Sequence, residues 1–138
     1  MTMPISYQIN PVLTTADFMD ILQRSTLGER RPLNDLAAME TMFKYGNVYV
    51  AAYEGKTLVG LARVMTDFVY TSYLSDLAVD VAFQQQGIGK RLIQEVQKAT
   101  PKAKVILLAA PAAEKYYPKI GMKNHPHCYL LAPGDELV

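Results

Sequence analysis

The feature that most restricts the fold is a glycine-containing turn between an expected strand and an expected helix, in residues 79–93, VDVAFQQQGIGKRLI. Apolar residues recur at helical spacing from Ile88 to Val96, which predicts a helix that ends at Thr100-Pro101. A helix start normally has a Ser, Thr, Asp or Asn cap and acids in its first turn. This one has neither, and it places Lys90 next to the positive end of the helix dipole. An anion from outside the chain would supply both missing features.

Two familiar phosphate-binding patterns do not fit this turn. A Walker loop needs glycine where Gln84 stands and Ser or Thr where Arg91 stands. A dinucleotide fingerprint needs a third glycine where Leu92 stands, and an acid about 20 residues further on, which is also missing. The remaining interpretation is that the backbone amides from Gln86 to Lys90 bind a pyrophosphate. The alternative is a helix that is merely frayed at its start.

The elements expected around this turn alternate between strands and helices. The expected strands cover residues 5–12, two stretches of 47–65 on either side of Glu54-Gly55-Lys56, 71–80, 104–110 and 128–133. The expected helices cover 15–25 with a Thr14 or Thr15 cap, 34–46 with an Asn34 cap and Gly46 as its C′ residue, the segment that starts at Ile88, and a short helix that begins at Pro111. The continuous apolar run 104–110 predicts a strand buried on both faces. This order predicts an α/β (mixed α+β) fold in one domain, 1–138.

Composition excludes several classes of function. The chain has 138 residues, half of them hydrophobic, and a formal net charge of +1 without a block of Lys and Arg, so we expect no nucleic-acid partner. No apolar run reaches the roughly 18–20 residues of a membrane span, and the first twelve residues do not resemble a signal peptide. The single cysteine, Cys128, lies in an apolar stretch and is expected to fill the core. These features favour a cytoplasmic protein, either a monomer or a homodimer.

Two short motifs resemble those of GNAT-type N-acetyltransferases. The family's Gln/Arg-x-x-Gly-x-Gly/Ala motif is matched by Gln84, Gly87 and Gly89, after a lead-in formed by Val79 and Phe83. A second motif, Ala-x-x-x-Tyr-x-x-x-Gly-Phe, is matched by Ala113, Tyr117 and Gly121, with Met122 in place of Phe. The order of the elements and the spacing of the two motifs agree with the family over essentially the whole chain. The resemblance implies a mixed, mostly antiparallel sheet of about six strands with about four helices, splayed between 71–80 and 104–110.

The resemblance also implies acetyl-CoA as co-substrate and no metal. Its pantetheine arm would pair with the backbone of Leu77, Ala78 and Val79, and the amine would attack the thioester directly, without a covalent acyl-enzyme. The remaining residues expected to bind the cofactor are Gln84, Gln85, Gln86, Gly87, Ile88, Gly89, Lys90 and Tyr117. The implied function is therefore the transfer of an acetyl group to a primary amine, with a small molecule favoured as the acceptor. The alternative is a non-catalytic acyl-CoA sensor or interaction module on the same fold.

The chemistry needs a base, an oxyanion donor and an acid. Tyr117 is the family-matched acid for the leaving thiolate, although Pro118 disfavours helical geometry at Tyr117 and leaves Tyr116 as an alternative. The Val79 N–H is the expected oxyanion donor. Asp76 is the first candidate for the base, because it is an acid in an apolar strand, on the face opposite Leu77 and Val79.

Several alternatives stay open for the base and for the acceptor site. Asp76 could equally form an ion pair, for example with Arg63, and Glu29 is a second candidate for the base. Glu29, Arg30 and Arg31 lie in the 26–32 loop and could contact the acceptor, or could form a solvated charged loop. The two histidines of NHPHC (124–128) lie two residues apart without a second ligand cluster, so we do not predict a metal site there. One of them could line the acceptor pocket.

Overall fold

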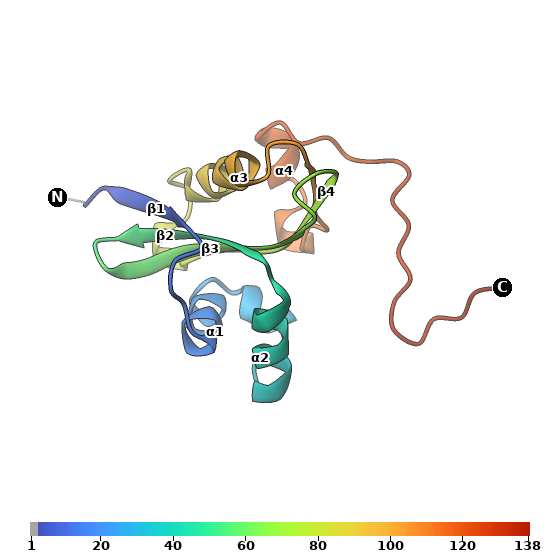
Figure 1. Cartoon of the computed structure of the whole chain (residues 1–138), viewed down its shortest axis with the longest axis horizontal. Coiled ribbons are helices and arrows are strands. Elements are labelled where there is room, and N and C mark those ends of the chain that lie inside the picture. The colour runs from blue at the N-terminus through green and yellow to red at the C-terminus, as the bar shows by residue number, and fades with distance from the viewer. Residues whose placement is uncertain (1–2) are drawn as a thin grey trace. The chain divides into compact units, whose positions relative to one another are not determined.

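The structure is a computed structural model, and it describes residues 3–138 (Figure 1). The chain forms two compact units, one that ends at Leu108 and one over Ala109–Val138, and each is described by itself. The expected single domain over 1–138 stays a prediction.

The first unit is built on a five-stranded sheet in the order β1-β2-β3-β4-β5. The strands are β1 (Ile5–Ile9), β2 (Val48–Glu54), β3 (Thr57–Thr66), β4 (Thr71–Val79) and β5 (Lys104–Ile106). The pairs from β1 to β4 are antiparallel, and β4 pairs with β5 in parallel. The predicted mixed, mostly antiparallel sheet is therefore confirmed, with five strands in place of about six.

Helices cover both faces of this sheet. They are α1 (Thr15–Arg24), the 3₁₀ turn η1 (Leu27–Arg30), α2 (Leu36–Tyr45), the 3₁₀ turn η2 (Val81–Phe83) and α3 (Ile88–Ala99). Figure 1 shows α1 and α2 on one face and α3 on the other. Successive residues of a strand point to opposite faces, so Ala51 packs in the core with Phe18 and Met39, whereas Ala52 lies toward Ile88. The sheet thus separates two apolar layers.

The first two helices begin with caps supplied by the sequence. Thr14 caps α1 and Asp17 completes a capping box, which confirms one of the two predicted caps. The cap of α2 is Asp35, so the prediction of Asn34 is wrong by one residue. Gly46 closes α2, as predicted, but it is the C-cap residue in extended geometry and not the C′ residue. Glycine is needed there because a Cβ would lie 2.7 Å from the Tyr49 hydroxyl oxygen.

The β2–β3 hairpin turns at Gly55 and Lys56, as predicted. Gly55 has φ +60°, in the left-handed region that favours glycine. The register of β3 against β4 is interrupted by a bulge beside Ser75, between the pairs Val64–Leu74 and Arg63–Asp76. Such bulges often lie beside functional sites, because they redirect side chains.

The sheet opens between β4 and β5. β5 pairs with Thr71–Tyr73, so among the described strands the remaining part of β4, up to Val79, has no partner on that side. The prediction of a strand over 104–110 buried on both faces is wrong, because β5 ends at Ile106 and is partly exposed. Continuous apolar sequence favours burial, but β5 has a neighbouring strand along three residues only. The predicted opening between the two strands is confirmed.

The second unit contains the 3₁₀ turn η3 (Pro111–Ala113) and the helix α4 (Tyr116–Lys119). Pro111 begins η3, as predicted for this proline. Residues 128–133 form no strand, and the side chain of Tyr129 is 90% exposed, so the predicted last strand is wrong. A strand needs a partner for its backbone groups, and no described residue pairs with this segment. Cys128 is exposed, which corrects its expected place in the core.

Candidate active site

The open edge of β4 presents backbone groups that no strand uses. The Asp80 N–H donates to the Val59 carbonyl at 2.9 Å, so Asp80 and Ala78 face β3. Backbone groups alternate along an antiparallel strand, and Leu77 and Val79 therefore face the open side. The Val79 carbonyl accepts the Gln84 side-chain amide at 3.2 Å. Among residues 3–138, no partner is found for the Leu77 N–H or C=O.

A partly buried ion pair fixes the turn that follows β4. The Asp80 carboxylate accepts the Ala82 N–H at 2.8 Å and so caps η2. Arg24 of α1 donates to Asp80 at 2.5 Å and to the Leu58 carbonyl at 2.6 Å. Arg24 also pairs with Asp20, one turn earlier on α1, at 2.9 Å. Sequence reasoning missed Arg24, because its partner lies 56 residues away and no local pattern marks it.

The start of α3 has free amides, as expected for a helix without a cap. Gly87 is the N-cap residue, with φ +81°, and no side chain caps the helix. The first intrahelical bond runs from the Arg91 N–H to the Gly87 carbonyl, at 3.0 Å. In the part of the chain that the structure describes, the N–H groups of Ile88, Gly89 and Lys90 have no acceptor. A Cβ at Gly87 would have no atom within 4 Å, so the N-cap residue itself lies in open space.

Two cations lie near this helix start, and they differ in whether an acid pairs with them. The Arg91 Nε lies 2.9 Å from the Glu95 Oε1, and its guanidinium lies 4.7 Å from the centre of the Tyr7 ring. The hydrogen bond from Arg91 lowers the pKa of Glu95, and Lys98 lowers it further, against the opposing effect of burial. The charge of Arg91 is thus balanced within α3. Lys90 is exposed and has no ion pair among the described residues.

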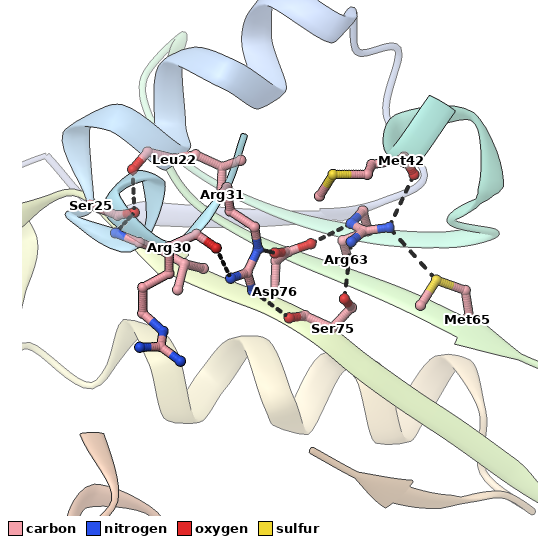
Figure 2. Close-up of polar contacts among 10 residues, drawn as sticks. Leu22, Ser25, Arg30, Arg31, Met42, Arg63, Met65, Ser75 and Asp76 are labelled. Carbon is pink, nitrogen blue, oxygen red and sulfur yellow. Dashed lines mark hydrogen bonds and ion pairs between the residues drawn. The ribbon is translucent and has the colours of Figure 1, made fainter. Parts of the chain in front are cut away.

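Asp76 forms a buried ion-pair cluster with two arginines, the Arg31–Asp76–Arg63 cluster (Figure 2). The Asp76 side chain is 1% exposed. The Arg31 Nε donates to Asp76 Oδ1 at 2.6 Å, and the Arg63 Nε donates to Asp76 Oδ2. The ion pair with Arg63, one of the two roles considered for Asp76, is present. The partnership with Arg31, 45 residues away, was not expected from the sequence.

Further hydrogen bonds pin the segment between α1 and α2 onto β4. Arg31 donates to the carbonyl of Ser75 at 2.9 Å and to that of Arg30 at 3.0 Å. Arg63 donates to the Ser75 hydroxyl oxygen at 2.9 Å and to the Met42 carbonyl at 3.0 Å. Both arginines therefore meet at the bulge of β4, beside its open edge.

Only one of the three residues expected to contact an acceptor reaches β4. Glu29 and Arg30 lie in η1 and are exposed. Figure 2 shows the Arg30 guanidinium extending away from the cluster, while its backbone carbonyl accepts from Arg31. Arg31 alone connects this loop to the strand.

Tyr117 lies in α4 of the second unit. Burial raises its pKa, and the neighbouring Tyr116 raises it further, so the phenol stays protonated at neutral pH. The two rings meet edge to face, with centroids 5.2 Å apart. Pro118 does not break α4, because it lies in the first turn, where its missing N–H has no helical acceptor.

Neither a metal cluster nor a membrane-spanning helix is found in the described part of the chain. Over residues 3–138, no group of three or more His, Cys, Asp or Glu side chains could hold a metal ion. The Nδ1 of His125 accepts the His127 N–H at 3.0 Å, and both residues are exposed. None of the described helices is long and apolar enough to cross a bilayer.

Comparison with known sequences gives a consistent result. A family model described as "Acetyltransferase (GNAT) domain" matches residues 26–127, which is 102 of the 138 residues. A histone acetyltransferase, TAP1, from Glycine max is 28% identical over 113 residues, covering 70% of this chain and 47% of the relative. The chain thus spans about half the length of the curated relatives it matches.

Two solved structures share the fold. A GNAT family acetyltransferase from Streptococcus pneumoniae TIGR4 has a TM-score of 0.69 at 23% identity, covering 87% of this chain and 88% of its own. The aminoglycoside N-acetyltransferase AAC(6')-Iy, solved in complex with CoA, has a TM-score of 0.71 at 15% identity, covering 96% of each chain. The family model extends over most of this chain, and the open β4 edge and the uncapped α3 lie within its range. The chain therefore belongs to the GNAT acetyltransferase family.

Proposed function

We propose that the protein is an N-acetyltransferase that moves an acetyl group from acetyl-CoA to the nitrogen of a primary amine. The observation that carries the proposal is the open edge of β4 beside the uncapped start of α3. The edge presents unpaired strand groups up to Val79, and the helix presents unpaired amides from Ile88, nine residues later in the chain. Membership of the acetyltransferase family supports the same function.

The expected cofactor residues divide into two groups by position. The segment from Gln84 to Lys90 would hold the pyrophosphate, through the free amides of α3 and the charge of Lys90. The open backbone N–H and C=O of Leu77 would pair with the pantetheine arm as an added strand. The Val79 N–H on the same edge would serve the acetyl oxygen, and Ala78 between them faces β3. A structural neighbour solved with CoA supports an acyl-CoA as co-substrate.

The reaction we propose is direct attack on the thioester. The amine loses a proton and its nitrogen forms a bond to the acetyl carbon, giving a tetrahedral oxyanion that accepts a hydrogen bond from the Val79 N–H. The C–S bond then breaks, the nitrogen gives up its second proton to solvent, and the CoA thiolate takes a proton, so that the products are the amide and the CoA thiol. Tyr117 is the proposed donor of that proton, and its raised pKa means that the phenol carries a proton at neutral pH.

We propose that Asp76 holds the Arg31 and Arg63 side chains in place and does not act as the general base. Each of its carboxylate oxygens already accepts a hydrogen bond from an arginine, and the side chain is buried. The proton of the amine would instead leave to solvent. Replacing Asp76→Asn tests this choice, because a base would lose at least about 100-fold in kcat, whereas an anchor loses mainly stability. A 100-fold loss of kcat in a folded variant would restore Asp76 as the base.

For the acceptor we propose a small molecule rather than a protein. Solved neighbours named as aminoglycoside acetyltransferases support this choice, whereas a relative named as a histone acetyltransferase supports the alternative. An assay of small amines beside a histone-tail peptide separates the two classes. Preferential turnover of the peptide would overturn the small-molecule assignment.

Two measurements test the function itself. We expect acetyl-CoA to raise the melting temperature while ATP and NAD do not, because a ligand that binds only the folded state stabilises it. We then expect amine-dependent release of CoA thiol across a panel of primary amines. Stabilisation without turnover would identify an acyl-CoA sensor, and stabilisation by ATP alone would refute the cofactor assignment.

A further inference from the structure

The Arg31–Asp76–Arg63 cluster carries more positive than negative charge. Two guanidinium groups share one carboxylate, and the exposed fractions of the Arg31 and Arg63 side chains are 19% and 6%. Over residues 3–138, no second carboxylate lies within 4.0 Å of either guanidinium. The cluster therefore has a net charge of +1 in a largely buried place. An uncompensated buried charge is costly, and a further anion would balance it.

The Arg31 guanidinium also has hydrogen-bond donors without an acceptor among the described residues. A guanidinium has five N–H groups. Those of Arg31 donate to Asp76, to the Arg30 carbonyl and to the Ser75 carbonyl, one bond from each of its three nitrogens. One N–H is left on each terminal nitrogen without an acceptor among the described residues. With two N–H groups left, the guanidinium retains donors for the oxygens of a carboxylate or a phosphate.

The position of Arg31 relates these donors to the proposed reaction. Arg31 is anchored at Ser75, which lies two residues before Leu77 and four before Val79 on the open part of β4. At about 3.3 Å per residue, the separation is about 7–13 Å along the strand. An amine that attacks a thioester near these residues could place an anionic group at Arg31 if several bonds separate the two groups.

We infer that the acceptor is a primary amine that carries an oxyanionic group, a carboxylate or a phosphate, bound by Arg31. Asp76 and Ser75 hold the guanidinium in place, and Arg63 supplies the surplus charge behind it. The inference rests on the proposed function, and it adds the class of acceptor to that function. The binding is non-covalent, and the acetyl transfer itself is unchanged.

The test compares acceptors of matched length. Three series are assayed with acetyl-CoA, namely ω-amino carboxylates from glycine to 6-aminohexanoate, ω-aminoalkyl phosphonates and plain alkylamines. We expect one anionic series to exceed the alkylamines in kcat/KM by at least about tenfold, the effect of one or two charge-assisted hydrogen bonds. The better of the two anionic series identifies carboxylate or phosphate. The preference is expected to be largest at intermediate chain lengths.

Two variants of Arg31 test whether this residue is the cause of the preference for anionic acceptors over alkylamines. In Arg31→Gln we expect kcat/KM for the anionic acceptors to fall to within about twofold of that for the alkylamines. Arg31→Lys keeps the charge but loses the planar set of N–H donors, so its preference should lie between those of the unmodified protein and Arg31→Gln. Lys102→Gln is the control, because it removes one charge at an exposed position in the turn before β5. A purely structural role for Arg31 would lower all rates together and leave the ratio unchanged. Melting temperatures verify that each variant is folded.

The outcomes separate this inference from the proposed function. If alkylamines are acetylated as fast as the anionic series, the class of acceptor is wrong and the acetyltransferase assignment stands. An anionic preference that survives in Arg31→Gln would also overturn the role of Arg31. If acetyl-CoA binds but no amine is acetylated, the proposed function and this inference fail together.

Discussion

The starts of α1 and α3 solve the same problem in different ways. Both helices pack against the central sheet, and both have unsatisfied N–H groups in their first turn. In α1 the Thr14 hydroxyl accepts the Asp17 N–H at 3.1 Å, and the Asp17 carboxylate accepts the Thr14 N–H at 2.9 Å. In α3 the corresponding position is Gly87, and no side chain caps the helix. One helix completes its own start, and the other leaves it open.

The charged residues in the first turns of the two helices differ as well. The first turn of α1 contains the acid Asp17, whereas the first turn of α3 contains no acid and includes Lys90. Because the N-terminal end of a helix carries a partial positive charge, an acid stabilises it and a cation does not. This difference is the one expected if the start of α3 binds an external anion, as proposed above.

The largest effect is expected from Gly87→Val. Gly87 has φ +81°, which a β-branched residue adopts only at a cost of about 2 kcal/mol or more. The turn would rearrange and its amides would no longer converge, so we expect acetyl-CoA to bind at least about 30-fold more weakly. Isothermal titration measures the affinity. Gly134→Val is the matched control, because Gly134 also has a positive φ and open space around it, outside the proposed site.

A charge reversal at the start of α3 is expected to have opposite effects on stability and binding. In Lys90→Glu the acid favours the helix dipole, so the free energy of unfolding without ligand should rise by about 0.5 kcal/mol. The same acid repels a pyrophosphate, and acetyl-CoA should bind about tenfold more weakly. Lys102→Glu makes the same charge change just beyond the other end of α3, in the turn after its C-cap Thr100. Equal affinities in the two variants would show that no anion binds at α3.

Removing the cap of α1 provides the other half of the comparison. Thr14→Ala is expected to lower the free energy of unfolding by about 1 kcal/mol, the usual effect of losing an N-cap side chain. Denaturant unfolding measures the change. The affinity for acetyl-CoA should stay within about twofold of the unmodified protein, because α1 uses its cap for stability alone. A parallel loss of affinity would mean that the two helix starts are coupled.

The smallest effect concerns Arg91, whose charge is balanced by Glu95. Because Arg91 lowers the pKa of Glu95 in the folded state, this pair stabilises the protein above the ordinary Glu pKa of 4.5 and ceases to do so as the pH falls through the lowered value. In Arg91→Gln we expect a loss of about 0.3–0.5 kcal/mol near pH 7 that shrinks toward pH 3. Urea unfolding at several pH values measures it. Any part due to the contact with Tyr7 should not depend on pH, and the affinity for acetyl-CoA should change little.

Local sequence patterns predicted the elements that depend on neighbouring residues. The helical spacing from Ile88 to Val96 placed α3, and Gly55 placed the β2–β3 turn. The α2 cap was misplaced by one residue because Asn34 and Asp35 are both good caps, and local sequence does not say which one faces the first turn. The strands beyond Ile106 failed for a different reason, because an apolar segment becomes a strand only when another strand pairs with it.

The candidate site also has features that local sequence predicts and features that depend on tertiary packing. The missing acid and cap at the start of α3 are properties of a few consecutive residues. The sequence alone therefore predicted an uncapped helix start whose free N–H groups could bind an anion. The Arg31–Asp76 and Arg24–Asp80 pairs join residues 45 and 56 positions apart, and no local pattern indicates them. Only the tertiary structure decided that Asp76 lies between two arginines, because ion pairing between distant residues depends on how the helices and the sheet pack. The sequence determined where an anion could bind, and the packing determined which charges surround the neighbouring strand.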